Sequence, residues 1–140
     1  MPDRAARCAA LLADAFPEGG HWSEAEISAV LARDGGYLFE NEGGFLIVSA
    51  VLDEAEIWTI AVHPDKRHHG YARDLIRQAV EKIALDGVTR LFLEVAEDNE
   101  AARALYVSMG FTEGGRRKGY YRRATGDRMD AILMTIQFGA

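Results

Sequence analysis

A strand, a helix and a second strand follow one another between residues 56 and 96, and no other feature constrains the fold as strongly. Glu56–Val62 and Leu91–Ala96 are apolar runs of strand length. Between them, Tyr71–Leu85 has the apolar spacing of a helix and ends at Asp86-Gly87. Two strands joined in this way lie parallel in one sheet, and their connection is right-handed. The sequence therefore predicts a mixed α/β sheet with at least one such crossover.

The rest of the chain completes one domain over residues 1–140, because no repeat or linker divides it. Ser23 and Glu26 form a capping box at the start of the second helix. Asn41–Gly44 is a hairpin turn between two strands. The further elements expected are helices at Arg4–Phe16, Glu24–Arg33 and Asn99–Met109, strands at Tyr37–Glu40, Phe45–Leu52 and Ala131–Phe138, a strand beginning at Phe111-Thr112, and a basic loop at Arg116–Arg128.

Composition excludes several classes of protein. No apolar stretch approaches the ~20 residues of a membrane span, and the first ten residues lack a secretory pattern. The single cysteine, Cys8, excludes an internal disulfide and is expected to be a packed small hydrophobe, so the location predicted is cytoplasmic. A net charge of −6 argues against a nucleic-acid binder. His63, His68 and His69 have no ligand framework around them, and no metal is expected.

A basic turn, Lys66–Gly70, links the first of these strands to its helix. Backbone N–H groups at a helix start are unpaired and the helix dipole is positive there, so the turn could bind an anion. Gly70 would let a phosphate approach the backbone, and Arg67 could add a charged contact. The alternative is a solvated turn that only begins the helix.

Glu94 and Tyr106 are the polar side chains that stand out in the second half. Alternation along the strand places Glu94 on one face with Phe92 and Ala96, where burial would raise the pKa of an unpaired carboxyl and suit it to accept a proton. The alternative is an edge strand with Glu94 in water. Asn99 is a good N-cap, and Tyr106 lies two turns further on, as a catalytic group or as half-buried core.

Four motifs carry a family resemblance. Arg67-His68-His69-Gly70-Tyr71-Ala72 fits the pattern Q/R-x-x-G-x-G/A, and LEVAEDNEAARALYVSMGF spans residues 93–111. Gly119-Tyr120-Tyr121 and Asp130-Ala131-Ile132-Leu133-Met134 follow in order. Together they resemble the GCN5-related N-acetyltransferases (GNATs), and more narrowly the bacterial RimI-type ribosomal-protein-alanine N-acetyltransferases.

The resemblance implies a fold and a set of roles. The fold would be a mixed, mostly antiparallel central sheet with helices on both faces, here without the family's usual N-terminal strand. Acetyl-CoA would be the donor. Its pyrophosphate would lie on the turn 67–72, and its pantetheine arm would pair with the strand Ile60-Ala61-Val62. Glu94 would be the general base, Tyr106 the general acid, and Asn99 would help to hold the donor.

The acceptor implied is a protein N-terminal α-amine, with a ribosomal protein's terminal alanine as the target, bound by a monomer or weak dimer. The residues expected to contact it are Trp22, Glu56, Trp58, Glu94, Tyr120 and Tyr121. Three alternatives stay open: acetylation of lysines or a small amine, an acyl-CoA-binding regulatory module without turnover, and an RNA-binding protein. The last would use the basic cluster Arg116, Arg117, Lys118, Arg122, Arg123 and Arg128, within which we interpret the tyrosines as the lining of a peptide groove.

Overall fold

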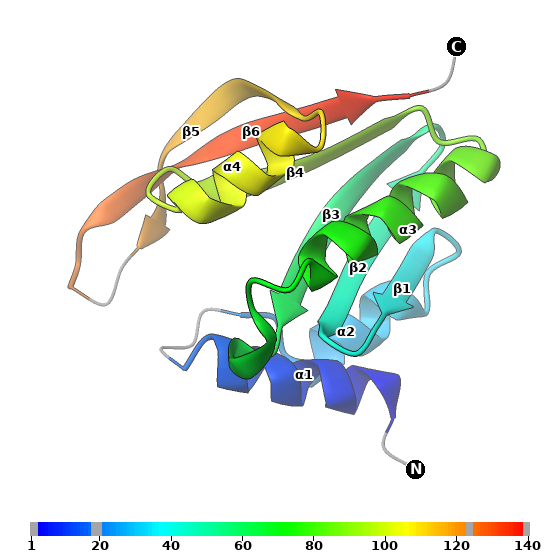
Figure 1. Ribbon diagram of the computed structural model, residues 1–140, viewed down its shortest axis with the longest axis horizontal. Coiled ribbons are helices and arrows are strands. Elements are labelled where there is room, and N and C mark those ends of the chain that lie inside the picture. Colours follow the sequence, from blue (N-terminus) through cyan, green and yellow to red (C-terminus); the bar gives the residue numbers. More distant parts are fainter. Residues whose placement is uncertain (1–2, 18–20, 123–124, 139–140) are drawn as a thin grey trace.

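The computed structural model describes residues 3–17, 21–122 and 125–138. Six strands form one sheet in the order β1-β2-β3-β4-β6-β5, and every neighbouring pair is antiparallel except β3–β4 (Figure 1). The elements are α1 (Arg4–Ala15), α2 (Glu24–Leu31), β1 (Gly36–Glu40), β2 (Gly44–Val51), β3 (Glu54–Val62), a 3₁₀ turn η1 (Pro64–Lys66), α3 (Tyr71–Leu85), β4 (Arg90–Ala96), α4 (Glu100–Ser108), β5 (Thr112–Arg122) and β6 (Arg128–Gln137). The mixed, mostly antiparallel sheet expected from the sequence is confirmed.

Helices cover both faces of the sheet, and β2 is buried between them. Leu46 and Val48 face the larger cluster, which we call the α3 cluster because Leu75, Ile76, Ala79 and Ile83 of that helix fill it together with Tyr106 of α4. Phe45 and Ile47, on the other face of β2, pack against α1 and α2 in the α1–α2 cluster. Alternate side chains of one strand therefore contribute to both cores.

The predicted parallel crossover is present, but β3 and β4 soon separate. Among the residues that the structure describes, they pair only from Glu54–Arg90 to Glu56–Phe92. Beyond this point β3 continues alongside β2, and β4 continues alongside β6. Figure 1 shows the two strands diverging toward the start of α3. The sheet thus opens into a split whose two facing strand edges are free for other hydrogen bonds.

A β-bulge lies within β3, just before the segment of the strand that borders the split. Ile47 of β2 pairs with Thr59, but the next residue, Val48, pairs with Ile57, so Trp58 is an extra residue in β3. A bulge bends a strand and redirects its side chains. It sits between the paired start of β3 and the segment Ile60–Val62 that borders the split.

The prediction of a loop at Arg116–Arg128 is wrong. Residues 116–122 belong to β5, and β6 already begins at Arg128. Glycines and consecutive charged residues hide the alternation of apolar and polar side chains that marks a strand. The pairing with β6 also shifts register between Glu113 and Arg116 and again between Arg117 and Tyr121. β5 is held by the long-range ladder rather than by local propensity. Arg123 of the basic cluster lies outside the described residues.

The local predictions are confirmed with small shifts at the ends. The capping box is complete, since Ser23 Oγ accepts from the Glu26 N–H at 3.1 Å and Glu26 Oε1 accepts from the Ser23 N–H at 2.9 Å. The first two helices end at Ala15 and Leu31, one and two residues earlier than expected. Across the described residues, no helix is long and apolar enough to cross a membrane.

Candidate functional site

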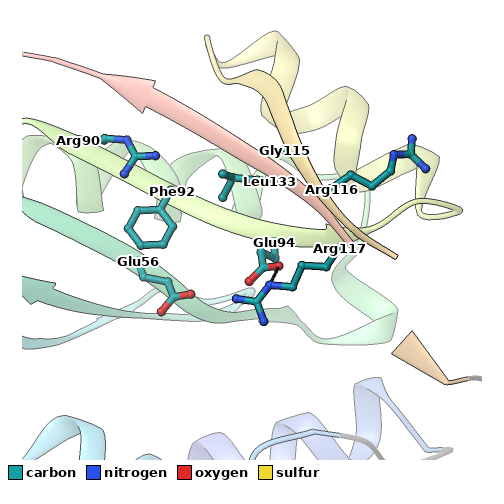
Figure 2. Close-up of a pocket in the computed structure, with 8 residues that line it drawn as sticks. All are labelled: Glu56, Arg90, Phe92, Glu94, Gly115, Arg116, Arg117 and Leu133. Atoms are coloured by element: carbon teal, nitrogen blue, oxygen red, sulfur yellow. Dashed lines mark ion pairs between the residues drawn. The ribbon is translucent and has the colours of Figure 1, made fainter. Parts of the chain in front are cut away.

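A pocket of about 350 Å³ lies where β3 and β4 part. Its floor is the last paired position of the two strands, Glu56 and Phe92, and its walls come from β4, β5 and β6 (Figure 2). The lining residues are Glu56, Arg90, Phe92, Glu94, Gly115, Arg116, Arg117 and Leu133. It therefore combines the apolar side chains of Phe92 and Leu133 with two carboxylates and three guanidinium groups.

Glu94 points into this pocket, as the alternation of β4 predicted. Leu91, Leu93 and Val95 are buried in the α3 cluster, so Glu94 lies on the opposite face. The alternative of an edge strand with Glu94 in water is wrong, because β4 lies between β3 and β6 and the Glu94 side chain is only 16% exposed. The carboxylate is paired with Arg117, whose Nε lies 2.9 Å from Glu94 Oε2.

Glu56 is a second carboxylate of the same pocket. Desolvation by burial raises its pKa, the nearby negative charge of Glu94 raises it further, and the positive charge of Arg117 opposes both. A carboxyl with a raised pKa can accept and release protons nearer to neutral pH. Sequence reasoning had assigned Glu56 only to acceptor binding; its place opposite Phe92 depends on the β3–β4 register, which no local pattern reveals.

The two tyrosines of the Gly-Tyr-Tyr motif lie beside this carboxylate pair. Tyr121 donates its hydroxyl to the backbone carbonyl of Glu94 at 3.4 Å. Tyr120 packs edge-on against Tyr121, with ring centroids 5.1 Å apart, and the guanidinium of Arg117 lies 4.8 Å from the centre of the Tyr120 ring. The structure thus places Tyr120, Tyr121 and Glu94 together, as expected.

Tyr106 lies on the other face of β4, in the α3 cluster. It is 5% exposed and packs against Phe111. Burial, and to a lesser extent the neighbouring Tyr121, raise the pKa of Tyr106 to about 12. The side chain is therefore a neutral proton donor at physiological pH. Tyr121, which donates to the Glu94 carbonyl, is also the group that adds to the rise in the pKa of Tyr106.

The basic turn ends in two residues with left-handed backbone. His68 has φ 67° and Gly70, the N-cap of α3, has φ 81°. Of the described side chains none caps α3, and a Cβ built on Gly70 would meet nothing within 4 Å. The helix N-terminus therefore opens onto free space with its N–H groups available, and Arg67, His68 and His69 are exposed around it. Tyr71 and Ala72 form the first turn of α3.

The remaining predicted donor-site residues fall around the split. Ile60, partly buried, packs against the α3 cluster and Ala61 is buried in the α1–α2 cluster; with Val62 they end β3, paired to β2 on one side. Asn99 is the N-cap of α4, where its Oδ1 accepts from the Ala102 N–H at 3.2 Å. Its side chain is exposed rather than facing the core.

Trp22 and Trp58 form a stacked pair at the edge of the α1–α2 cluster. Their ring centroids are 4.4 Å apart, and Trp22 Nε1 donates to the carbonyl of Trp58 at 3.0 Å. The guanidinium of Arg33 lies 5.0 Å from the Trp58 ring. The bulge of β3 is thus fixed by the loop between α1 and α2, an interaction that sequence reasoning missed because it joins residues 36 apart.

Two further features concern possible metal ligands and the single cysteine. No group of three or more His, Cys, Asp or Glu side chains there could hold a metal ion. Cys8 is buried in the α1–α2 cluster, where desolvation raises its thiol pKa to about 11, so it is a packed apolar side chain.

Comparison with known families matches residues 6–111 to the acetyltransferase (GNAT) family. The [ribosomal protein bS18]-alanine N-acetyltransferase of Escherichia coli K12 is 44% identical over 92 residues. That match covers 66% of this chain, and it spans 62% of the length of the E. coli enzyme, less than two thirds.

Solved structures agree in fold. The crystal structure of the E. coli ribosomal-protein-S18-alanine N-acetyltransferase superposes with a TM-score of 0.82 and 33% identity, over 99% of this chain and 92% of that one. A GNAT acetyltransferase from Elizabethkingia anophelis with acetyl-CoA bound has a TM-score of 0.74 and 21% identity, over 99% and 92%. With the family match extending over more than half of its length, the chain belongs to the acetyltransferase (GNAT) family.

Proposed function

We propose that this protein is an acetyl-CoA-dependent N-acetyltransferase that acts on the N-terminal α-amine of a protein, with a ribosomal protein's terminal alanine as its target. The observation that carries the proposal is the pair of carboxylates, Glu56 and Glu94, in one pocket at the mouth of a split sheet. The similarity to the bS18-alanine N-acetyltransferase of E. coli supports the choice of acceptor.

The residues around the split fit acetyl-CoA. The uncapped N-terminus of α3, with Arg67 beside it and open space above Gly70, suits a pyrophosphate. The edge of β3 from Ile57 to Val62 that faces away from β2 has backbone groups available for an amide-containing arm such as pantetheine. When bound, acetyl-CoA supplies the acetyl group as a thioester.

The pocket handles the protons that such a transfer moves. An α-amine arrives as an ammonium ion and must lose a proton before it can attack a carbonyl, and Glu94 accepts that proton in our proposal. Glu56 adds a second negative charge that favours the ammonium. On the donor side, Tyr106 Oη gives a proton to the departing sulfur; because burial raises its pKa to about 12, the phenol is protonated before the transfer.

Aromatic side chains would bind the acceptor chain beyond its first residue. Tyr120 is 53% exposed on β5, and the Trp22–Trp58 stack borders β3 on the other side of the split. Large rigid rings provide contact area at little cost in conformational entropy. In this proposal Tyr120 and Tyr121 form one wall of the acceptor groove and the two tryptophans the other.

A thiol-release assay tests the proposal. It compares two peptide amides. The first begins with alanine and has a free α-amine. The second is the same peptide with an acetylated N-terminus and one internal lysine. Release of CoA with the first peptide alone is the expected result. Equal release with both would assign the activity to lysines or to amines in general, and release with neither, while acetyl-CoA still binds, would favour a regulatory module.

A further inference from the structure

The chain places a cation of its own on its catalytic carboxylate. Arg117 Nε lies 2.9 Å from Glu94 Oε2, and Figure 2 shows the guanidinium reaching from β5 into the space between Glu94 and Glu56. An acceptor ammonium that gives its proton to Glu94 needs the same position, because a proton is transferred over hydrogen-bond distance. Both cations cannot occupy it together.

Arg117 differs from its neighbour in how firmly it is held. Arg116 pairs with both Glu97 and Asp130, which fixes it outside the reacting position. Arg117 makes one ion pair with the residues that the structure describes, its side chain is 61% exposed, and it extends from the edge strand β5. In the same position the guanidinium also lies 4.8 Å from the Tyr120 ring, a contact that can remain when the ion pair with Glu94 opens.

We propose that Arg117 is a specificity-determining residue that occupies the acceptor's ammonium position and is displaced by it. The inference rests on the proposed acetyl transfer at Glu94. An acceptor with a positively charged amine replaces the guanidinium one for one, so Glu94 and Glu56 keep a cation beside them throughout. A neutral acceptor leaves the Arg117–Glu94 pair closed. The pocket therefore takes protonated primary amines, in competition with its own arginine.

Binding measured without turnover tests this. Calorimetric titrations with a short peptide amide that begins with alanine, in the presence of CoA, compare the wild-type protein with Arg117→Ala. Because an ion pair with one largely exposed partner is weak, removal of the internal competitor is expected to lower the Kd of the free-amine peptide by roughly three- to fivefold. The N-acetylated form of the same peptide has no N-terminal ammonium group, so its Kd reports on the peptide's other contacts.

Two matched variants separate the competition from other effects. Arg117→Lys keeps a cation at the end of the same strand and is expected to bind the peptide like the wild type. Arg7→Ala removes an arginine from another exposed pair, in which Arg7 lies 2.9 Å from Glu40 and away from the pocket, and it should also leave the Kd unchanged. Circular dichroism of each variant checks that it is folded.

The results that would overturn this inference differ from those that would overturn the proposed function. A lower Kd for the free-amine peptide in Arg117→Ala alone would support the inference. A Kd that rises or stays the same, an equal gain for the N-acetylated peptide, or no binding to either protein would overturn it. Acetyl transfer is measured on the same samples, so a protein that binds the amine as expected but transfers nothing would contradict the proposed function and not this inference.

Discussion

At the scale of single residues, our proposal assigns the chemistry to two carboxylates and one buried tyrosine, and their amide and phenyl variants test these roles. Glu94→Gln keeps the shape of the side chain but cannot accept a proton, so we expect kcat to fall about a hundredfold. Glu56→Gln removes only the supporting charge and should cost about tenfold or less, at the lower end of what a proton-handling group contributes. Steady-state kinetics with acetyl-CoA and an alanine peptide give both values. The reverse order would make Glu56 the proton acceptor.

Tyr106 makes stability depend on pH in the alkaline range. Its folded pKa of about 12 lies above the unfolded value of 10.0, so the folded state holds the proton more tightly. The stabilisation is complete below pH 10 and is lost as the pH rises toward 12, by up to about 3 kcal/mol. Urea unfolding at several pH values should show this loss, and Tyr106→Phe should lack this part of it. An identical pH profile in the variant would mean that the hydroxyl is not buried in solution.

At the scale of elements, the hairpin between β1 and β2 positions the start of α3. Asn41 Nδ2 donates to the Tyr71 carbonyl at 3.1 Å and to Asp74 Oδ2 at 2.9 Å. Its Oδ1 accepts from the N–H groups of Gly43 and Gly44 at 2.9 and 3.0 Å. The helix end that we assign to the pyrophosphate is therefore tied to the turn by one side chain.

Breaking this connection should weaken donor binding without slowing the chemistry. Asn41→Asp keeps the acceptor for the hairpin but loses both donors to α3, at about 1 kcal/mol each. We expect the KM for acetyl-CoA to rise roughly five- to tenfold while kcat stays within about twofold. Asn41→Ala should raise this KM as well. A fall in kcat at constant KM would instead connect Asn41 to the reacting groups.

Elements fixed by local chemistry could be predicted from the sequence. The capping box of Ser23 and Glu26, the turn at Asn41–Gly44 and the helix Tyr71–Leu85 each depend on residues close together in the chain, and all are present. β5 could not be predicted, because only its pairing with β6 makes a strand of a segment rich in glycine and charge. The β3–β4 split is likewise a property of strand order.

In the candidate site, too, some features follow from the local sequence and others only from the pairing of distant strands. Alternation along β4 was enough to place Glu94 on one face with Phe92 and Ala96, and the structure confirms that Leu91, Leu93 and Val95 occupy the other face. The Arg117–Glu94 pair connects β5 with β4, which are separated by β6 in the sheet, and its two residues are 23 apart in the chain. Neither composition nor spacing could reveal that pair, or the raised pKa of Glu56, which is caused first by burial and second by the charge of Glu94.

The whole molecule should unfold as one unit, because β2 contributes side chains to both clusters. Leu12 is fully buried under α2 in the α1–α2 cluster, and Leu12→Ala should lower the free energy of unfolding by about 2–5 kcal/mol. Tryptophan fluorescence reports on this cluster through Trp22 and Trp58, and circular dichroism reports on all helices. The two urea transitions should coincide in the wild type and shift together in the variant. Separate transitions would mean that the faces unfold independently.

The most direct test of the whole account is to locate the acetyl group on a single peptide that offers both kinds of amine. The peptide begins with alanine, has a free α-amine and contains one internal lysine, and fragmentation mass spectrometry after incubation with acetyl-CoA gives the position. The account predicts acetylation of the α-amine, with the lysine left unmodified. Acetyl groups on the lysine, or on neither amine, would contradict it.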